Sequence, residues 1–261
     1  MNQTLWRMLV GAALCLAIHL SASAQQHKLV DAKDGSGVFG YKDTPVQPWS
    51  GFHVHDPDRP VPPRVTPPAA SSDLKAAAPS DAVVLFGGQD LAAWRPSTWQ
   101  VERGELVATD GPLVSTEEFG DCQLHLEWMA PLEPTANIMN RGNNGVFLLN
   151  AIEVQIFDSF STRLYPDGQA AAIYGQTPPR VNACREPGQW QSYDILFLAP
   201  KYEGSTRVAP ARLTMLHNGL LVHLDQEIYG TTPHARLAEY PAQPLTKGPL
   251  SLGAHRCPVR F

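Results

Sequence analysis

The chain has 261 residues, of which 43% are hydrophobic and 17% are charged, and its formal net charge is -5. This composition suits one globular domain with extensions, because its core is large enough to fold unaided. A mildly acidic chain without basic runs argues against nucleic acid and anionic membranes as partners. The 24 prolines and 20 glycines favour strands and turns over helices.

Residues 1–24 are typical of an export signal. Arg7 precedes an apolar run from Met8 to Leu20, and Ala22-Ser23-Ala24 offers the small residues that a signal peptidase recognises. The run is too short to cross a bilayer comfortably, so no membrane span is expected. The protein is therefore expected to be exported, either to the periplasm or into the medium. Removal of the signal leaves three cysteines, which permit one disulfide without indicating which residues pair: Cys122, Cys184 and Cys257.

Residues 25–79 form a proline-rich extension. Pairs such as Pro62-Pro63 and Pro67-Pro68 fix the backbone and remove hydrogen-bond donors. The segment is therefore expected to be extended, and either to wrap the domain or to be partly disordered. His53 and His55 stand at alternate positions, which is a weak metal pattern. The favoured interpretation is two surface histidines without a ligand.

From residue 80 onward the pattern changes to short strands between Gly and Pro turns. The strands are expected in the apolar run Val83–Phe86, in a hairpin formed by 99–102 and 105–108, and in the alternating segment Cys122–Trp128. The last of these puts His125 and Glu127 on one face, which could meet either solvent or a groove. No stretch between Ala82 and Phe261 has a helical period. This spacing predicts a β-sandwich.

The strongest hairpin signal is Asn218-Gly219, which stands between the segments 212–217 and 220–224. A type I′ turn needs two residues with positive φ, and Asn-Gly supplies both. The resulting register puts His217 on the same face as Leu213 and Met215. His217 is therefore expected to be a core or edge histidine rather than a ligand.

One further strand, 152–156, alternates between apolar and polar residues. Ile152, Val154 and Ile156 point one way, and Glu153 and Gln155 point the other way. Alternation alone is compatible with a strand whose polar face simply meets water. From alternation alone this interpretation is favoured, and the alternative is a sheet whose polar face lines a groove. Screens for a Gly-x-Ser-x-Gly elbow, a phosphate loop, a dinucleotide fingerprint, His-Glu-x-x-His and Cys/His zinc spacing are negative. The candidates that remain are polar residues on or beside strands: Glu127, Glu153, Gln155, Asp158 and His255.

Several short motifs follow one another between about Val83 and Phe261. They are Leu85-Phe86-Gly87-Gly88-Gln89-Asp90-Leu91, Phe119-Gly120-Asp121-Cys122, Asn144-Gly145-Val146-Phe147-Leu148, Ile152-Glu153-Val154-Gln155-Ile156-Phe157-Asp158-Ser159, Ala172-Ile173-Tyr174-Gly175-Gln176, Leu216-His217-Asn218-Gly219, and His255 with Pro258-Val259-Arg260-Phe261. In this order they resemble the 3-keto-disaccharide hydrolase domain family of exported bacterial proteins. The extension with Val54-His55-Asp56 resembles the proline-rich leader that some members carry.

The resemblance implies an all-β fold for residues 80–261, namely a two-sheet antiparallel jelly-roll sandwich of the concanavalin A-like lectin/glucanase type. One sheet of such a sandwich is concave and lined with polar residues, and 152–156 corresponds to its central strand. The end at Pro258–Phe261 is similar to the start of a strand, which predicts a domain that lacks its final strand.

The resemblance also implies cleavage of 3-keto-glycosides. A base removes the C2 proton, the C1 aglycone leaves by elimination, and water adds to the product. The enolate oxygen needs a hydrogen-bond donor or a divalent cation. Glu153 and His255 are implied as base and acid, in either order. Glu127 and Gln155 would orient the sugar or hold a metal, and three more residues would contact hydroxyls: Asn144, Asp158 and Tyr174.

Two features of this sequence differ from what a sugar-cleaving enzyme of these types would carry. Gln155 stands where a glucanase would have a carboxylate, which argues against a two-carboxylate mechanism. The loop Gly253-Ala254-His255-Arg256-Cys257 replaces the family's Gln-Asp-His-Gly-Asn and so removes neighbours that would orient the histidine. The alternatives are therefore a carbohydrate-binding module without activity and an ordinary glycoside hydrolase.

Overall fold

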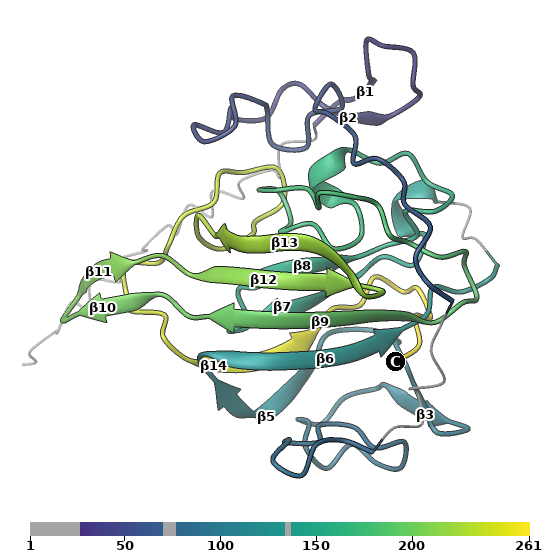
Figure 1. Cartoon of the computed structure of the whole chain (residues 1–261), viewed down its shortest axis with the longest axis vertical. Coiled ribbons are helices and arrows are strands. Elements are labelled where there is room, and N and C mark those ends of the chain that lie inside the picture. Colours follow the sequence, from purple (N-terminus) through teal and green to yellow (C-terminus); the bar gives the residue numbers. More distant parts are fainter. Residues whose placement is uncertain (1–26, 70–76, 134–136) are drawn as a thin grey trace, which may run out of the picture.

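The computed structural model describes residues 27–69, 77–133 and 137–261, and the expected export signal lies outside them. Two four-stranded antiparallel sheets pack face to face, with strand orders β13-β12-β9-β6 and β5-β14-β7-β8 (Figure 1). The expected all-β, two-sheet sandwich is therefore confirmed.

The first sheet consists of β6 (Cys122–Trp128), β9 (Gln191–Leu198), β12 (Arg212–His217) and β13 (Leu220–Glu227). The second consists of β5 (Leu113–Phe119), β7 (Asn144–Leu148), β8 (Ile152–Ile156) and β14 (Gly248–Leu252). Three small hairpins are β1 (Leu29–Asp31) with β2 (Phe39–Tyr41), β3 (Gln100–Glu102) with β4 (Glu105–Val107), and β10 (Lys201–Glu203) with β11 (Thr206–Ala209). Two short 3-10 helices are η2 (Ile138–Asn140) and η3 (Pro166–Gly168).

The core lies between the two sheets and follows from alternation along their strands. On β9, Tyr193 and Ile195 are fully buried, whereas Leu196 on the opposite face is 47% exposed. On β8, Val154 and Ile156 are fully buried in the same core cluster. Since successive side chains of a strand point to opposite faces, the β8 residues between these core-facing ones must lie on the outer face of the sheet.

Of the strands that the sequence predicted, one is wrong. Asn218 and Gly219 have φ of 52° and 77° and join β12 to β13, and His217 is buried beside the core, as expected. The hairpin predicted around Arg103-Gly104 is β3–β4. The strand expected at Val83–Phe86 is absent. Val83 and Val84 are more than half exposed there, because this run pairs with no neighbouring strand.

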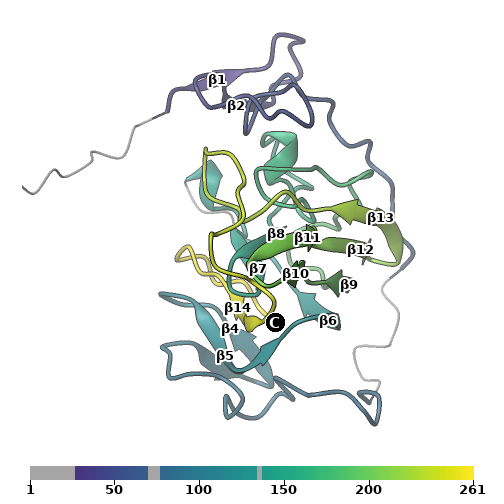
Figure 2. The same ribbon diagram turned by 90° about the vertical axis from the view of Figure 1, so that its left-hand side faces the viewer.

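The described part of the proline-rich extension, residues 27–69, is called the leader below. It lies across one end of the sandwich, beyond the edge where β8 runs (Figures 1 and 2). Phe39 forms a bridge with Leu164, the Trp49 ring stacks on Tyr229 at 4.2 Å between centroids, and Arg64 lies over the ring of Phe160. The expectation that His53 and His55 lie at the surface is wrong for His55, which has no exposed area.

The last residues of the chain lie between β4 and the end of β6. The backbone of Phe261 exchanges hydrogen bonds with Leu106, and that of Arg260 with Met129. Of the cysteines in the described residues, Cys122, Cys184 and Cys257 are all free thiols. No helix within the described ranges is long and apolar enough to cross a bilayer.

Candidate active site

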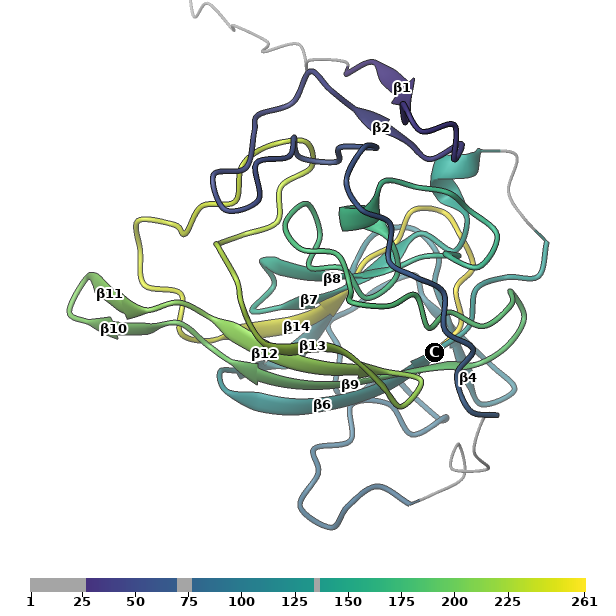
Figure 3. The same cartoon turned by 45° about the horizontal axis from the view of Figure 1, so that its top comes forward.

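The outer face of β8 carries the two polar residues that the sequence singled out. In the register of β7 with β8, Phe147 stands opposite Glu153 and Gly145 opposite Gln155. All four therefore share one face of the sheet. This face does not form an open hollow, because loops and the leader cover it (Figure 3), and only 7% of Glu153 is exposed.

The outer edge of β8 fixes the neighbours of Glu153. The backbone N–H of Tyr174 donates to the carbonyl of Glu153 at 3.1 Å, and the N–H of Gln155 donates to the carbonyl of Ala172 at 2.9 Å. The N–H of Glu153 donates to the hydroxyl of Thr232 at 2.9 Å. Two loops thus act as an additional strand along β8, and they bring Tyr174 and the residues that follow Thr232 beside Glu153.

The carboxyl group of Glu153 is buried, and no described hydrogen bond compensates for its loss of contact with water. No described residue donates a hydrogen bond to it, and burial raises its pKa to about 8. A carboxylate removed from water is costly, so the neutral acid is favoured. At pH 7 Glu153 is therefore mainly protonated. It is packed against the backbone of Gly145, where a Cβ atom would lie 2.8 Å from Glu153 Cγ.

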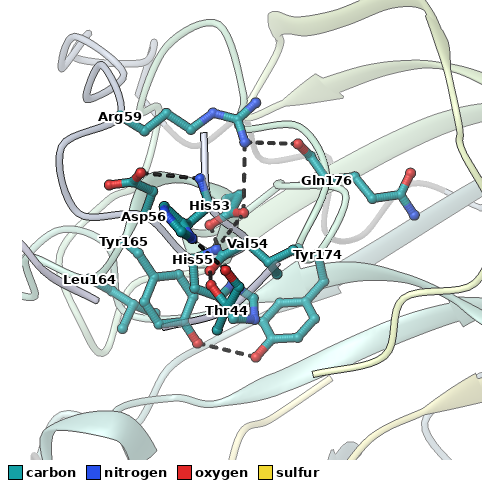
Figure 4. Close-up of polar contacts among 12 residues, drawn as sticks. Thr44, His53, Val54, His55, Asp56, Arg59, Leu164, Tyr165, Tyr174 and Gln176 are labelled. Carbon is teal, nitrogen blue, oxygen red and sulfur yellow. Dashed lines mark hydrogen bonds and ion pairs between the residues drawn. The ribbon is translucent and has the colours of Figure 1, made fainter. Parts of the chain in front are cut away.

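A chain of hydrogen bonds runs past Glu153. The Tyr174 hydroxyl lies 3.1 Å from the Tyr165 hydroxyl and 2.7 Å from Nδ1 of His234. Figure 4 shows the contact between the two phenols. Burial raises the pKa of both tyrosines well above the usual value, so both stay neutral. Desolvation, together with the neighbouring His55, His27 and His255, lowers the pKa of His234 to about 4. The chain is thus uncharged at neutral pH.

His255 comes to this group through the loop that follows β14. The N–H of Gly253 donates to the carbonyl of Gly145 at 2.8 Å, and Gly145 is the residue against which Glu153 packs. Among the named causes that lower the pKa of His234, His255 contributes least. Partial desolvation lowers the pKa of His255, although its side chain is exposed. At neutral pH it is an unprotonated imidazole.

The other predicted site residues are placed differently. Gln155 lies on the face of Glu153, and its side-chain oxygen is buried without a described partner. Asn144 pairs with core-facing Ile156, and its oxygen accepts from the N–H of Gly145. Asp158 accepts from the N–H of Ser161 in the loop after β8. The structure therefore brings Glu153, Gln155 and Tyr174 together and leads the loop that carries His255 past Gly145, whereas Asn144 shares the core-facing side of Ile156 and Asp158 lies in the loop after β8.

Glu127 lies on the other sheet, across the core from Glu153. Its Oε1 lies 3.8 Å from Nε2 of His125 on the same strand. Nδ1 of His125 in turn lies 2.6 Å from Oδ1 of Asp194 on the neighbouring strand β9. The expectation that Glu127 shares a groove with Glu153 is wrong. Alternation correctly put Glu127 opposite Leu124 and Leu126, but it could not show which of the two sheets carries the covered face.

Sequence reasoning missed a buried pair that joins the leader to the domain. The N–H of His55 donates to Oδ2 of Asp167 at 3.0 Å, and His55 Nδ1 lies 3.3 Å from Oδ1. His55 Nε2 is buried without a described partner. Asp167-Gly168 has the sequence of an ordinary turn, and the alternate histidines were the one signal that pointed to this contact.

The residues do not fit a metal site. In the described ranges no three His, Cys, Asp or Glu side chains gather so that they could hold an ion. Glu127 and Gln155, which were expected to hold a metal, therefore have no matching partners in this geometry.

Comparison with known proteins agrees with the fold. Residues 81–261 match the model of the 3-keto-alpha-glucoside-1,2-lyase-like domain. The chain belongs to this family. Membership makes it a carbohydrate-active protein of the glycoside hydrolase type. No curated protein matches the sequence.

Solved structures of three proposed glycosyl hydrolases from Parabacteroides distasonis ATCC 8503 are similar to this chain. The first is 35% identical with a TM-score of 0.67, and the match covers 77% of this chain and 89% of that one. The second is 19% identical with a TM-score of 0.49, covering 68% of this chain and 89% of that one. The third is 20% identical with a TM-score of 0.49, and the match covers 67% of this chain and 92% of that one.

Gly145→Ala tests whether the backbone of β7 sets the position of Glu153. The added methyl group would overlap the Glu153 side chain, so the carboxyl group must move while the strand pairing is kept. We expect a folded protein that loses about 100-fold or more in turnover, because a misplacement of about 1 Å at a reacting group has such an effect. Steady-state kinetics and circular dichroism measure both properties. Retained turnover in a folded variant would contradict this prediction.

Proposed function

We propose that this protein is an exported enzyme that cleaves 3-keto-glycosides by elimination and hydration. The observation that supports this best is the protonation state of the site. Glu153 is a neutral carboxylic acid packed against Gly145, and the loop that carries the neutral imidazole of His255 is hydrogen-bonded to Gly145 through Gly253. One can donate a proton and the other can accept one near pH 7, which is what an elimination requires.

The first step of the proposed reaction forms an enolate. A ketone at C3 acidifies the proton on C2, and the imidazole of His255 takes that proton. The electron pair of the C2–H bond then forms the C2–C3 double bond, and the negative charge moves to the C3 oxygen. The amide of Gln155 and the neutral phenol of Tyr174 can donate hydrogen bonds to this oxygen. Donors enclosed in a poorly solvated site stabilise such charge strongly.

The second step expels the aglycone. The enolate electrons form the C1–C2 double bond as the C1–O bond breaks, and Glu153 gives its proton to the departing oxygen. The carboxylate of Glu153 then takes a proton from water as the hydroxyl adds to C1, and the imidazolium of His255 returns a proton to C2, so both groups regain their starting states. The net change is hydrolysis of the glycosidic bond. Glu153 thus acts as the acid and His255 as the base, an order that the sequence left open.

An ordinary glycoside hydrolase is less well supported. Such enzymes use two carboxyl groups about 5 to 9.5 Å apart, on either side of the scissile bond. Among the described residues, Asp167 is engaged by His55 and Arg59, and Asp158 accepts from the Ser161 backbone. On the face of β8 the position next but one to Glu153 is occupied by Gln155. Among the described residues around Glu153, no second carboxylate is therefore free to take part in such a mechanism.

Glu153→Gln removes the proposed acid with little change in shape. We expect turnover of an aryl 3-keto-glucoside to fall about 100-fold or more, within the range of general acid catalysis. Glu127→Gln is the matched control, because it makes the same change on the other sheet and should leave turnover unaltered. A plain aryl glucoside is the control substrate. Cleavage of both sugars would favour an ordinary hydrolase, and binding of the sugars without cleavage would favour a binding module.

The pH dependence tests the assignment of acid and base. Because burial raises the pKa of Glu153 to about 8, its acid form is present below that pH and is lost as the pH rises through it. The lowered pKa of His255 leaves the base unprotonated above about 6.5. We therefore expect kcat/KM to be bell-shaped with a descending limb near pH 8. A rate that instead rises through pH 8 would reverse the roles of the two residues.

Export is part of this proposal and rests on residues 1–24. Cleavage after Ala24 would make Gln25 the first residue of the mature protein. Expression of the full sequence in a Gram-negative host, followed by intact-mass measurement of the periplasmic fraction, should give a mass lacking the first 24 residues. An uncleaved product found in the cytoplasm would contradict it.

A further inference from the structure

The covered face of β8 is completed by rings from the leader. The His55 ring centroid lies 4.1 Å from that of Tyr165, 4.8 Å from Tyr174 and 5.1 Å from His234. These three rings are the members of the hydrogen-bonded chain that passes Glu153. Tyr41 adds a second leader ring, 5.8 Å from His234. Figure 4 shows His55 beside Tyr165 and Tyr174.

Asp167 holds His55 in one orientation and one tautomer. Burial opposes the charge of Asp167, yet His55 and Arg59 together lower the pKa of its carboxyl group. Asp167 is therefore a carboxylate, and it accepts from the backbone N–H of His55 and from Gln47 Nε2. Such an acceptor favours a proton on His55 Nδ1, which leaves a lone pair on Nε2.

Two features indicate that the imidazole at position 55 is retained at a cost. The φ angle of His55 is 62°, in the left-handed region where a residue with a side chain is strained. Its Nε2 is also buried without a described partner, and such a group is costly. Glycine would relieve both costs. A histidine kept under these conditions points to function rather than to packing alone.

We infer that the leader is part of the active site, and that His55, held by Asp167, is a positioning residue for the Tyr165–Tyr174–His234 chain beside Glu153. The inference rests on the proposed function, in which the phenol of Tyr174 faces the enolate oxygen. Without the His55 ring, the three side chains lose the surface against which they pack, and the direction of the Tyr174 hydroxyl is no longer fixed. His55 lies outside residues 81–261, so the matched domain alone does not contain this part of the site.

His55→Gly in the full chain is the direct test. The backbone at this position has a φ that glycine adopts without strain, so the variant removes the ring and leaves a ring-sized space. We expect kcat on the 3-keto-glucoside to fall about 100-fold while KM changes little, as for a misplaced group. Added imidazole should restore a large part of kcat, because it can fill the space and donate to Asp167. Thiophene has a similar size without an N–H group and should not.

Trp49→Leu is the matched control. It removes another ring contact between the leader and the domain, the stack on Tyr229, which does not involve the chain beside Glu153. If the leader only adds stability, both variants should lower the melting temperature and neither should lower kcat at a temperature where it is folded. Equal kcat in wild type and His55→Gly would overturn the inference, and so would equal rescue by imidazole and thiophene.

A second measurement does not depend on turnover. His234 contacts His55 and Tyr174, and desolvation together with His55, His27 and His255 lowers its pKa to about 4. NMR titration of its imidazole, assigned with His234→Gln, should show this pKa moving toward 6.5 in His55→Gly and unchanged in Trp49→Leu. If wild type does not cleave the 3-keto-glucoside, the proposed function fails and this titration still decides the role of His55. An unchanged titration in His55→Gly would overturn it.

Discussion

The outer edge of β8 determines how the site is built. A strand at the edge of a sheet leaves N–H and C=O groups unpaired, and these groups must find partners when the edge is covered. Here the partners are the backbone of residues 171–174 and the hydroxyl of Thr232. The same hydrogen bonds that satisfy the strand therefore bring Tyr174 and His234 to Glu153. The chemistry of the site is a consequence of how this edge is closed.

Enclosure also sets the charge of each group. Glu153 has no charged partner, so burial keeps it protonated, and the two phenols and His234 are neutral for the same reason. Asp167 is equally buried but has His55 and Arg59 beside it, and it remains a carboxylate. Two acidic side chains in one region thus take opposite states because only Asp167 has a guanidinium beside it and several hydrogen-bond donors.

The sequence predicted the sandwich because its strands have one buried and one exposed face, and period-two alternation records this difference directly. The turn at Asn218-Gly219 was predictable for a related reason, since few residue pairs adopt positive φ twice. The position of Glu153 and Gln155 on the same face of β8 also followed from alternation. The placement of Glu127 did not, because alternation is the same in both sheets and says nothing about what covers each of them.

The contact between the leader and the domain could not be derived in this way. His55 and Asp167 are 112 positions apart, and no local pattern links them. That separation also bears on how the protein folds. Contacts between distant positions form late, because a long loop must close before they contribute free energy. The pairing of Phe119 with Gly248 in the second sheet spans a still longer stretch, so this sheet and the leader contact both form late, and the outer face of β8 is completed only when both are in place.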